Sequence, residues 1–247
     1  MESKTAAFFD LDNTLIKGAA LFHLGKGLIK HKEINKKEIR VFARAQIKFR
    51  ATNKEPGLNK LAQKALEILA NREANKIELL SKKIVDDFLP YAIHPGALEL
   101  LRIAKEKYDE VWILTAAPEP LALIISEKLG LTGAIGTKLE VKDGFYTGKL
   151  INGFHHGVAK RDSVIEIAKL HGIKLEKCAS YSDSFNDLPL LKITGEAHAV
   201  NPDRKLRAYA KKNYWSIREL SNRYRNLYVL SFLIYTAVIL LLSLKFF

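Results

Sequence analysis

Residues 8–15 read FFDLDNTL, an apolar run that ends in two acidic side chains, Asp10 and Asp12. Two carboxylates so close together repel each other, and each is costly to bury. A solvated turn would accommodate them cheaply. A site at the end of a buried strand would also explain them, so the rest of the chain has to decide between the two interpretations.

Short apolar runs that end in polar residues recur along the chain, and stretches with helical i, i+3, i+4 spacing separate them. This alternation predicts an α/β fold, with a Rossmann-like parallel sheet and crossover helices. Alternating residues around KDG at 142–144 also predict a β-hairpin over residues 134–150. The strand candidates are TAAFF before Asp10, EVWIL before Thr115, CASYS before Asp183 and AHAV before Asn201.

Between the first strand candidate and the others, the pattern changes to long helical stretches. We interpret residues 17–92 as a helical cap that is inserted into an α/β core formed by residues 1–16 and 93–217. Cys178 is the only cysteine, which excludes an internal disulfide and favours an inert buried thiol.

In open parallel sheets, ligands bind beyond the carboxyl ends of the strands. Asp10, Thr115 and Asp183 all fall at such ends, although they are far apart in sequence. Asp10 and Asp12 are two residues apart, so an extended chain directs both side chains the same way. A cluster of carboxylates needs a cation, and no cysteine or spaced histidine cluster is available for zinc. We therefore expect Mg²⁺ at Asp10, Asp12 and Asp183.

Two further residues have the chemistry of a phosphate site. Thr115 offers a hydroxyl at a strand end, and Lys160 offers a cation at the start of a helical stretch. An aspartate nucleophile, a metal, a hydroxyl and a lysine together describe phosphoryl transfer through an aspartyl-phosphate.

With these residues, the chain resembles the haloacid dehalogenase superfamily, and more narrowly its phosphoserine-phosphatase-like branch, subfamily IB. The resemblance covers about residues 5–217 and includes an inserted cap after the first motif. Four motifs of the family are present in order: DLDNT (10–14), LTAAP (114–118), Lys160 in GVAKRD (157–162), and YSDSFNDLPLL (181–191).

The resemblance implies a role for each acid. Asp10 would attack phosphorus, and Asp12 would protonate the leaving oxygen and then activate water. Mg²⁺ would be held by Asp10, the main-chain carbonyl of Asp12, and Asp183. Asp187 would lie outside the direct metal ligands and would position water and Lys160.

The same resemblance places Thr115 and Lys160 on the phosphate, with Asn186 close by. The competing interpretation is that the acids are turn and cap residues of an inactive, binding-only domain. No catalytic position of the family is missing, which favours the enzyme.

The C-terminal sequence favours a membrane anchor. Residues 227–244 contain no charge, and residues 227–247 are predicted to form one transmembrane helix after a basic segment at 218–226. Basic residues precede this stretch, so the positive-inside rule predicts a single-pass protein of the cell (inner) membrane with a cytoplasmic catalytic domain. The formal net charge of +13 suits anionic headgroups and phosphorylated substrates. No nucleic-acid recognition motif accompanies the charge, so no nucleic-acid partner is expected.

The substrate is the least determined part of the prediction. Phosphoserine phosphatases carry a glutamate where this chain has Ala19, which disfavours an ammonium-bearing substrate. With the predicted anchor, the leading hypothesis is a lipid headgroup phosphate, as in phosphatidylglycerophosphate or a phosphatidate-like lipid. The alternatives are a soluble metabolite such as phosphoserine, and a non-catalytic membrane adaptor that binds phosphorylated partners.

Overall fold

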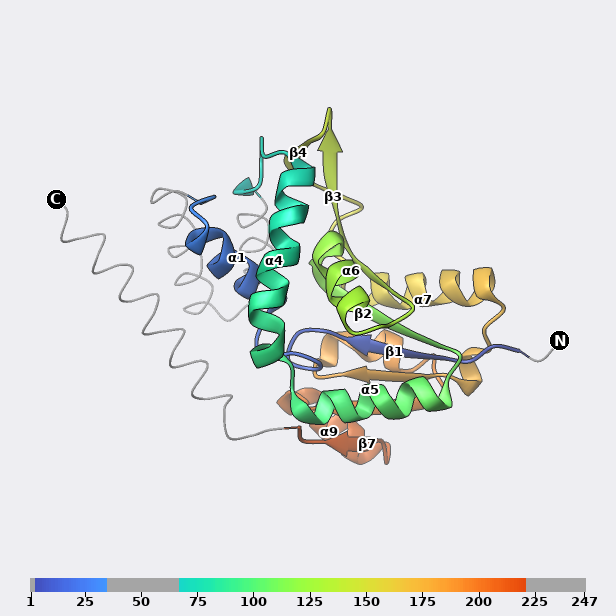
Figure 1. Ribbon diagram of the computed structural model, residues 1–247. Coiled ribbons are helices and arrows are strands. Elements are labelled where there is room, and N and C mark those ends of the chain that lie inside the picture. Colours follow the sequence, from blue (N-terminus) through green and yellow to red (C-terminus); the bar gives the residue numbers. More distant parts are fainter. Residues whose placement is uncertain (1–2, 35–66, 221–247) are drawn as a thin grey trace.

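The computed structural model describes residues 3–34 and 67–220, which are built around a seven-stranded sheet (Figure 1). The strand order is β4-β3-β2-β1-β5-β6-β7, and all neighbouring pairs are parallel except β3 and β4. The predicted α/β fold with a mostly parallel sheet is confirmed. The strands are β1 (Ala6–Asp10), β2 (Glu110–Pro118), β3 (Gly133–Lys142), β4 (Phe145–Ile151), β5 (Ala179–Ser182), β6 (Glu196–Val200) and β7 (Ser216–Arg218).

Helices cover both faces of the sheet. On one face, α5 (Pro95–Lys107) and α6 (Glu119–Lys128) share a hydrophobic cluster with Phe9 of β1. On the other face, α7 (Val158–His171) packs against Phe8. Adjacent residues of β1 thus enter opposite cores, and all five residues of this strand are buried. The remaining short elements are η1 (Leu175–Lys177), η2 (Phe185–Asp187), α8 (Leu188–Leu191) and α9 (Arg204–Lys212).

The predicted hairpin is present as β3 and β4. Its two-residue turn is Asp143-Gly144, with φ angles of 52° and 83°. Positive φ at both turn positions matches the right-handed twist of the flanking strands and explains the Asp-Gly pair. Gly172, with φ of 69°, ends α7 in the left-handed conformation that glycine adopts without strain.

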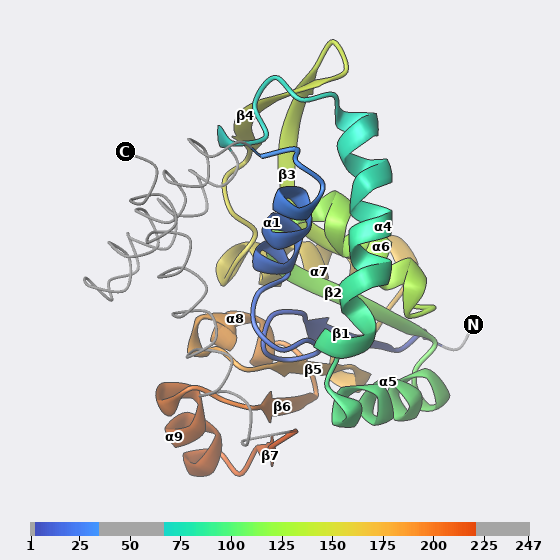
Figure 2. The ribbon, with the colours of Figure 1, turned by 60° about the vertical axis from the view of Figure 1, so that its left-hand side comes forward.

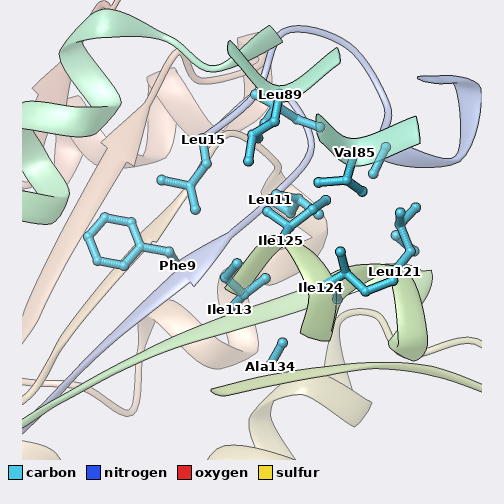
Figure 3. Close-up of a cluster of buried hydrophobic side chains, with 14 of the residues drawn as sticks. Phe9, Leu11, Leu15, Val85, Leu89, Ile113, Leu121, Ile124, Ile125 and Ala134 are labelled. Carbon is cyan, nitrogen blue, oxygen red and sulfur yellow. The ribbon is translucent and has the colours of Figure 1, made fainter. Parts of the chain in front are cut away.

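Two helices from the predicted cap are described, α1 (Ala20–Lys30) and α4 (Ala74–Ala92), and they lie side by side in both views (Figures 1 and 2). Their hydrophobic side chains continue into the core. Figure 3 shows Val85 and Leu89 of α4 in one buried cluster with Leu121 and Ile125 of α6. This part of the insertion is therefore packed on the sheet domain, and the division at residues 17–92 remains a prediction about chain organisation.

The predicted transmembrane helix at 227–247 and the end of the basic segment, residues 221–226, lie outside the described residues. Within residues 3–34 and 67–220, no helix is both long and apolar enough to span a bilayer. Cys178 is buried and its thiol donates to the Lys174 carbonyl at 3.2 Å, so the predicted burial of this thiol is confirmed.

Close approach of α1 and α4 depends on Gly27. A Cβ atom at this position would lie 2.4 Å from Cγ2 of Ile84, which α4 buries. We expect Gly27→Ala to lower the free energy of unfolding by about 1–3 kcal/mol, because the two helices would have to separate. Gly25→Ala is the matched control on the same helix.

A Cβ at Gly25 meets nothing within 4 Å, so alanine there should leave stability unchanged or raise it by up to about 1 kcal/mol. Chemical denaturation of the two variants beside the unsubstituted protein measures both effects. Equal effects at the two positions would show that the α1–α4 contact is looser than the structure has it.

Candidate active site

Parallel pairing brings the predicted site residues to one edge of the sheet. Asp10 pairs in register with Leu114, so Thr115 lies one residue beyond it on β2. On the other side of β1, Phe9 pairs with Tyr181, and Asp183 follows the last residue of β5. The three strand ends therefore meet, as the sequence predicts.

Lys160 lies between two carboxylates. Its Nζ is 2.6 Å from Oδ1 of Asp10 and 2.7 Å from Oδ2 of Asp187, and its side chain is only 3% exposed. Burial alone would lower the pKa of Lys160, but the two carboxylates outweigh it and raise that pKa, so the lysine stays charged. Lys160 thereby fixes the distance between the first-strand aspartate and the loop after β5.

The loop after β5 is held by its own side chains. Ser182 donates its hydroxyl to Oδ2 of Asp187 at 2.7 Å and accepts the Ser184 N–H at 3.1 Å. A Cβ on Gly157, which precedes α7, would lie 3.1 Å from the Asn186 carbonyl oxygen. Asn186 is exposed at the edge of this loop, so the structure brings it to the start of the helix that carries Lys160.

Asp12 sits in a different environment from Asp10. Its Oδ1 accepts the Ala20 N–H at the start of α1, at 2.8 Å. Burial, and then the neighbouring Asp10 charge, raise the pKa of Asp12 to about 7. Directly after Asp12 the chain turns through Asn13, whose φ is 60°; asparagine tolerates this left-handed conformation better than most residues.

Thr14 is a site residue that the sequence analysis did not assign. Its hydroxyl donates to Oδ2 of Asp10 at 3.1 Å, while Lys160 holds Oδ1. The two contacts fix the rotation of the Asp10 carboxylate. The signal was available in the motif DLDNT, because a threonine four residues after the aspartate can reach back across the turn.

His155 is the second residue that the sequence did not identify, and it is buried in the loop before α7. Its Nδ1 is 3.1 Å from the Thr115 carbonyl oxygen and its Nε2 is 2.9 Å from the Ser163 hydroxyl. Thr115 itself is fully buried, and its hydroxyl oxygen accepts the Ala117 N–H at 3.0 Å. The proton of that hydroxyl therefore remains available to a phosphoryl oxygen.

The chemistry of the donor set suits a hard divalent cation. Burial, with repulsion from Asp10 and Asp187, raises the pKa of Asp183 well above its usual range. No donor from the described residues contacts the Asp183 carboxylate, and the charge of Lys160 offsets only part of the cost of ionising it. A magnesium ion would do so, held by the Asp10 and Asp183 carboxylates and the Asp12 main-chain carbonyl.

Such a site has only two carboxylate ligands plus a backbone oxygen. Accordingly, among residues 3–34 and 67–220 no group of three or more His, Cys, Asp or Glu side chains has the arrangement of a metal site. The predicted contribution of Asp12 is thus from its main chain, because its side chain is engaged by the Ala20 N–H.

Comparison with known proteins settles the family. Residues 7–192 match the sequence profile of the haloacid dehalogenase-like hydrolases. The chain belongs to this family. The predicted resemblance is confirmed at that level, and the enzyme class is that of a phosphomonoester hydrolase.

Among curated relatives, the chain is 38% identical over 216 residues to phosphoserine phosphatase SerB1 of Mycobacterium tuberculosis, covering 87% of this chain and 70% of that protein. It is 28% identical over 223 residues to a histidinol-phosphatase of Neisseria meningitidis, covering 87% and 98%. A solved structure from Bordetella pertussis, of a protein of unknown function, shares this fold of the haloacid dehalogenase-like hydrolases. Its TM-score is 0.79 at 23% identity, and the match covers 89% of this chain and all of that one.

The buried His155 predicts a pH dependence of stability. Burial lowers its pKa from 6.5 to about 4, so between these values the unfolded chain binds a proton that the folded chain excludes. Stability from this residue is complete above about pH 6.5 and is lost as pH falls toward 4, by up to roughly 1.4 kcal/mol per pH unit.

Chemical denaturation of the protein and of His155→Asn from pH 7 to pH 4.5 isolates this effect, because other groups cancel in the difference. The gap in unfolding free energy should narrow as the pH falls. A gap that stays constant over this range would mean that His155 titrates normally in the fold.

Proposed function

We propose that this protein is a Mg²⁺-dependent phosphatase that hydrolyses a small phosphorylated metabolite through an aspartyl-phosphate on Asp10. The observation that carries the proposal is the buried Lys160, which touches both Asp10 and Asp187 while Asp12 is held apart by the Ala20 N–H. Two carboxylates in two environments suit two roles, a nucleophile and a proton donor.

In the first step, an Asp10 oxygen forms a bond to phosphorus as the ester P–O bond breaks. The electron pair leaves with the ester oxygen, which takes the proton of the Asp12 carboxyl group. A pKa of about 7 suits this exchange, because near neutral pH both forms of Asp12 are well populated. Thr14 and Lys160 hold the nucleophile in orientation throughout.

In the second step, a water oxygen bonds to phosphorus and its proton passes to the Asp12 carboxylate. The bond between phosphorus and Asp10 breaks, which releases inorganic phosphate and restores both aspartates. Lys160 and the Thr115 hydroxyl neutralise charge on the phosphoryl oxygens. When bound, Mg²⁺ would supply further charge neutralisation at the same oxygens.

A small metabolite is favoured by two of the relatives, a phosphoserine phosphatase and a histidinol-phosphatase. The first turn of α1, next to Asp12, contains no acidic side chain, and Ala19 precedes it. Near this turn, His23 stacks on Phe88 of α4, with ring centroids 4.6 Å apart. The relatives thus support the class of small phosphoesters, while the first turn of α1 disfavours members of it that would need a carboxylate there for an ammonium group.

A lipid headgroup phosphate remains the second candidate, and one surface favours it. Within the described residues, no carboxylate lies within ion-pair distance of the exposed basic side chains on and after α9, and Tyr214 beside them is 97% exposed. Uncompensated cations with an exposed aromatic ring suit anionic headgroups. With the uncharged run at 227–244, the surface also supports the proposed membrane localisation. These cations are Arg204, Lys205, Lys211, Lys212 and Arg218.

A substrate panel tests the function. The full chain, with Mg²⁺, is assayed on phosphoserine, histidinol phosphate, p-nitrophenyl phosphate, and vesicles that contain phosphatidylglycerophosphate. We expect turnover of a soluble ester, and Asp10→Asn should lower it by at least about 10³-fold because the nucleophile is lost. Asp143→Asn, in the exposed β3–β4 turn, is the control that should retain activity.

The panel separates the candidates. Turnover of the vesicle lipid alone, reduced by the pair Lys211→Glu and Lys212→Glu, would replace the metabolite with the lipid. If the protein bound phosphoesters but hydrolysed none of them, the function would be that of a non-catalytic adaptor that binds phosphorylated partners.

Metal binding is tested apart from activity. Because Mg²⁺ would offset the charge of the partly buried Asp183 carboxylate, which no donor contacts, saturating Mg²⁺ should raise the melting temperature by about 5–10 °C. In Asp183→Asn this increase should disappear, while Asp143→Asn keeps it. If Mg²⁺ did not change the melting temperature of the unsubstituted protein, the proposed metal site would be contradicted.

A further inference from the structure

His155 connects three segments that the proposed reaction needs in register. It is 8% exposed, and its polar atoms reach β2, β3 and α7. The mechanism above gives it no chemical role. A buried histidine is costly unless its polar atoms have partners, and here the two ring nitrogens contact β2 and α7 while the backbone N–H contacts β3.

The contacts fix which ring nitrogen carries the proton. Nδ1 lies 3.1 Å from a carbonyl oxygen, that of Thr115, so Nδ1–H must be the donor. In the neutral ring Nε2 is then an acceptor, and the Ser163 hydroxyl at 2.9 Å donates to it. Ser163 lies three residues after Lys160 on α7, so the imidazole connects the helix that carries Lys160 to the Thr115 end of β2.

His155 also orients the next peptide of β2, the one that joins Ala116 to Ala117. Its N–H donates to the Thr137 hydroxyl oxygen at 3.1 Å, and that hydroxyl donates to the Ala116 carbonyl at 2.7 Å. One residue thus orients two successive carbonyls, Thr115 directly and Ala116 through Thr137.

A trans peptide is planar, so its N–H points opposite to its C=O. The anchored Ala116 carbonyl sends the Ala117 N–H the other way, where it meets the Thr115 hydroxyl oxygen at 3.0 Å. By the same geometry, the anchored Thr115 carbonyl sends the Ala116 N–H away from His155. Ala116 is exposed, unlike its neighbours Thr115 and Ala117.

We propose that His155 is a positioning residue that holds the Ala116 N–H and the Thr115 hydroxyl in the orientation that binds the phosphoryl oxygens. The inference deepens the proposed function and rests on it. His155 touches no phosphoryl oxygen itself. Its effect on the anion passes through the Thr115 carbonyl and Thr137.

Two conservative variants separate the two ends of the ring. In His155→Asn the amide nitrogen takes the place of Nδ1 and can still donate to the Thr115 carbonyl. In His155→Gln the amide extends toward the place of Nε2 and Ser163 instead. His156→Asn is the matched control, because its side chain is exposed and adjacent.

The probe is orthovanadate with Mg²⁺, measured by its inhibition of p-nitrophenyl phosphate hydrolysis and, independently, by calorimetric binding. His155→Gln should weaken vanadate binding about 10-fold to 100-fold, the range for a lost hydrogen bond to a charged group. His155→Asn should remain within about 3-fold of the unsubstituted protein, and so should His156→Asn. Each variant is checked for folding by its melting curve, and the binding is measured on folded protein.

Equal weakening in His155→Asn and His155→Gln would reduce the residue to a packing role and overturn the proposal. So would vanadate binding in folded His155→Gln that equals that of the unsubstituted protein. Failure of the proposed function looks different, because the unsubstituted protein would then hydrolyse no ester. In that case calorimetric binding of vanadate to the same variants still decides the role of His155.

Discussion

The site depends on one buried ammonium group held between two buried carboxylates. Burying any one of these charges alone would cost several kcal/mol, and leaving one partner out of such a group typically costs about 3–5 kcal/mol. Lys160 comes from α7, Asp10 from β1 and Asp187 from η2, so their mutual contact is possible only when three remote segments are correctly placed. The contact of Lys160 with Asp10 and Asp187 is therefore required both for the folded arrangement of these segments and for the chemistry of the site.

The packing around the site explains how that placement is maintained. β1 is buried on both faces, with Phe9 in one core and Phe8 in the other, which leaves its last residue, Asp10, little freedom. The helices α1 and α4 restrict the other side of the site. The first N–H of α1 binds Asp12, and α4 shares the buried cluster with α6 (Figure 3). The helix that binds Asp12 and the helix that packs on α6 thus belong to the same hydrophobic cluster.

Much of this could be predicted from the sequence because the signals are local. Apolar runs that end in Asp10, Thr115 and Asp183 predict strands and their ends, and parallel pairing then forces those ends together. Asp-Gly at 143–144 predicts the hairpin for an equally local reason. The four ordered motifs identify the family without any tertiary information.

What the sequence could not supply depends on contacts between distant segments. His155 reads as a loop residue, and only the fold shows that it meets Thr115 forty positions away. The contact between the Asp12 side chain and the first N–H of α1 likewise forms only when that helix is in place. For the substrate, the sequence shows only that the first turn of α1 contains no acidic residue, which does not specify what the site binds.

The central claim is that Asp10 becomes phosphorylated during turnover. The most direct measurement is rapid acid quenching of the full chain with Mg²⁺ and a hydrolysed phosphoester, followed by peptide mass spectrometry. The account predicts a phosphoryl group on Asp10 of the peptide that contains residues 8–15, and none in Asp10→Asn. A phosphoryl group on any other residue, or turnover that continues in Asp10→Asn, would contradict it.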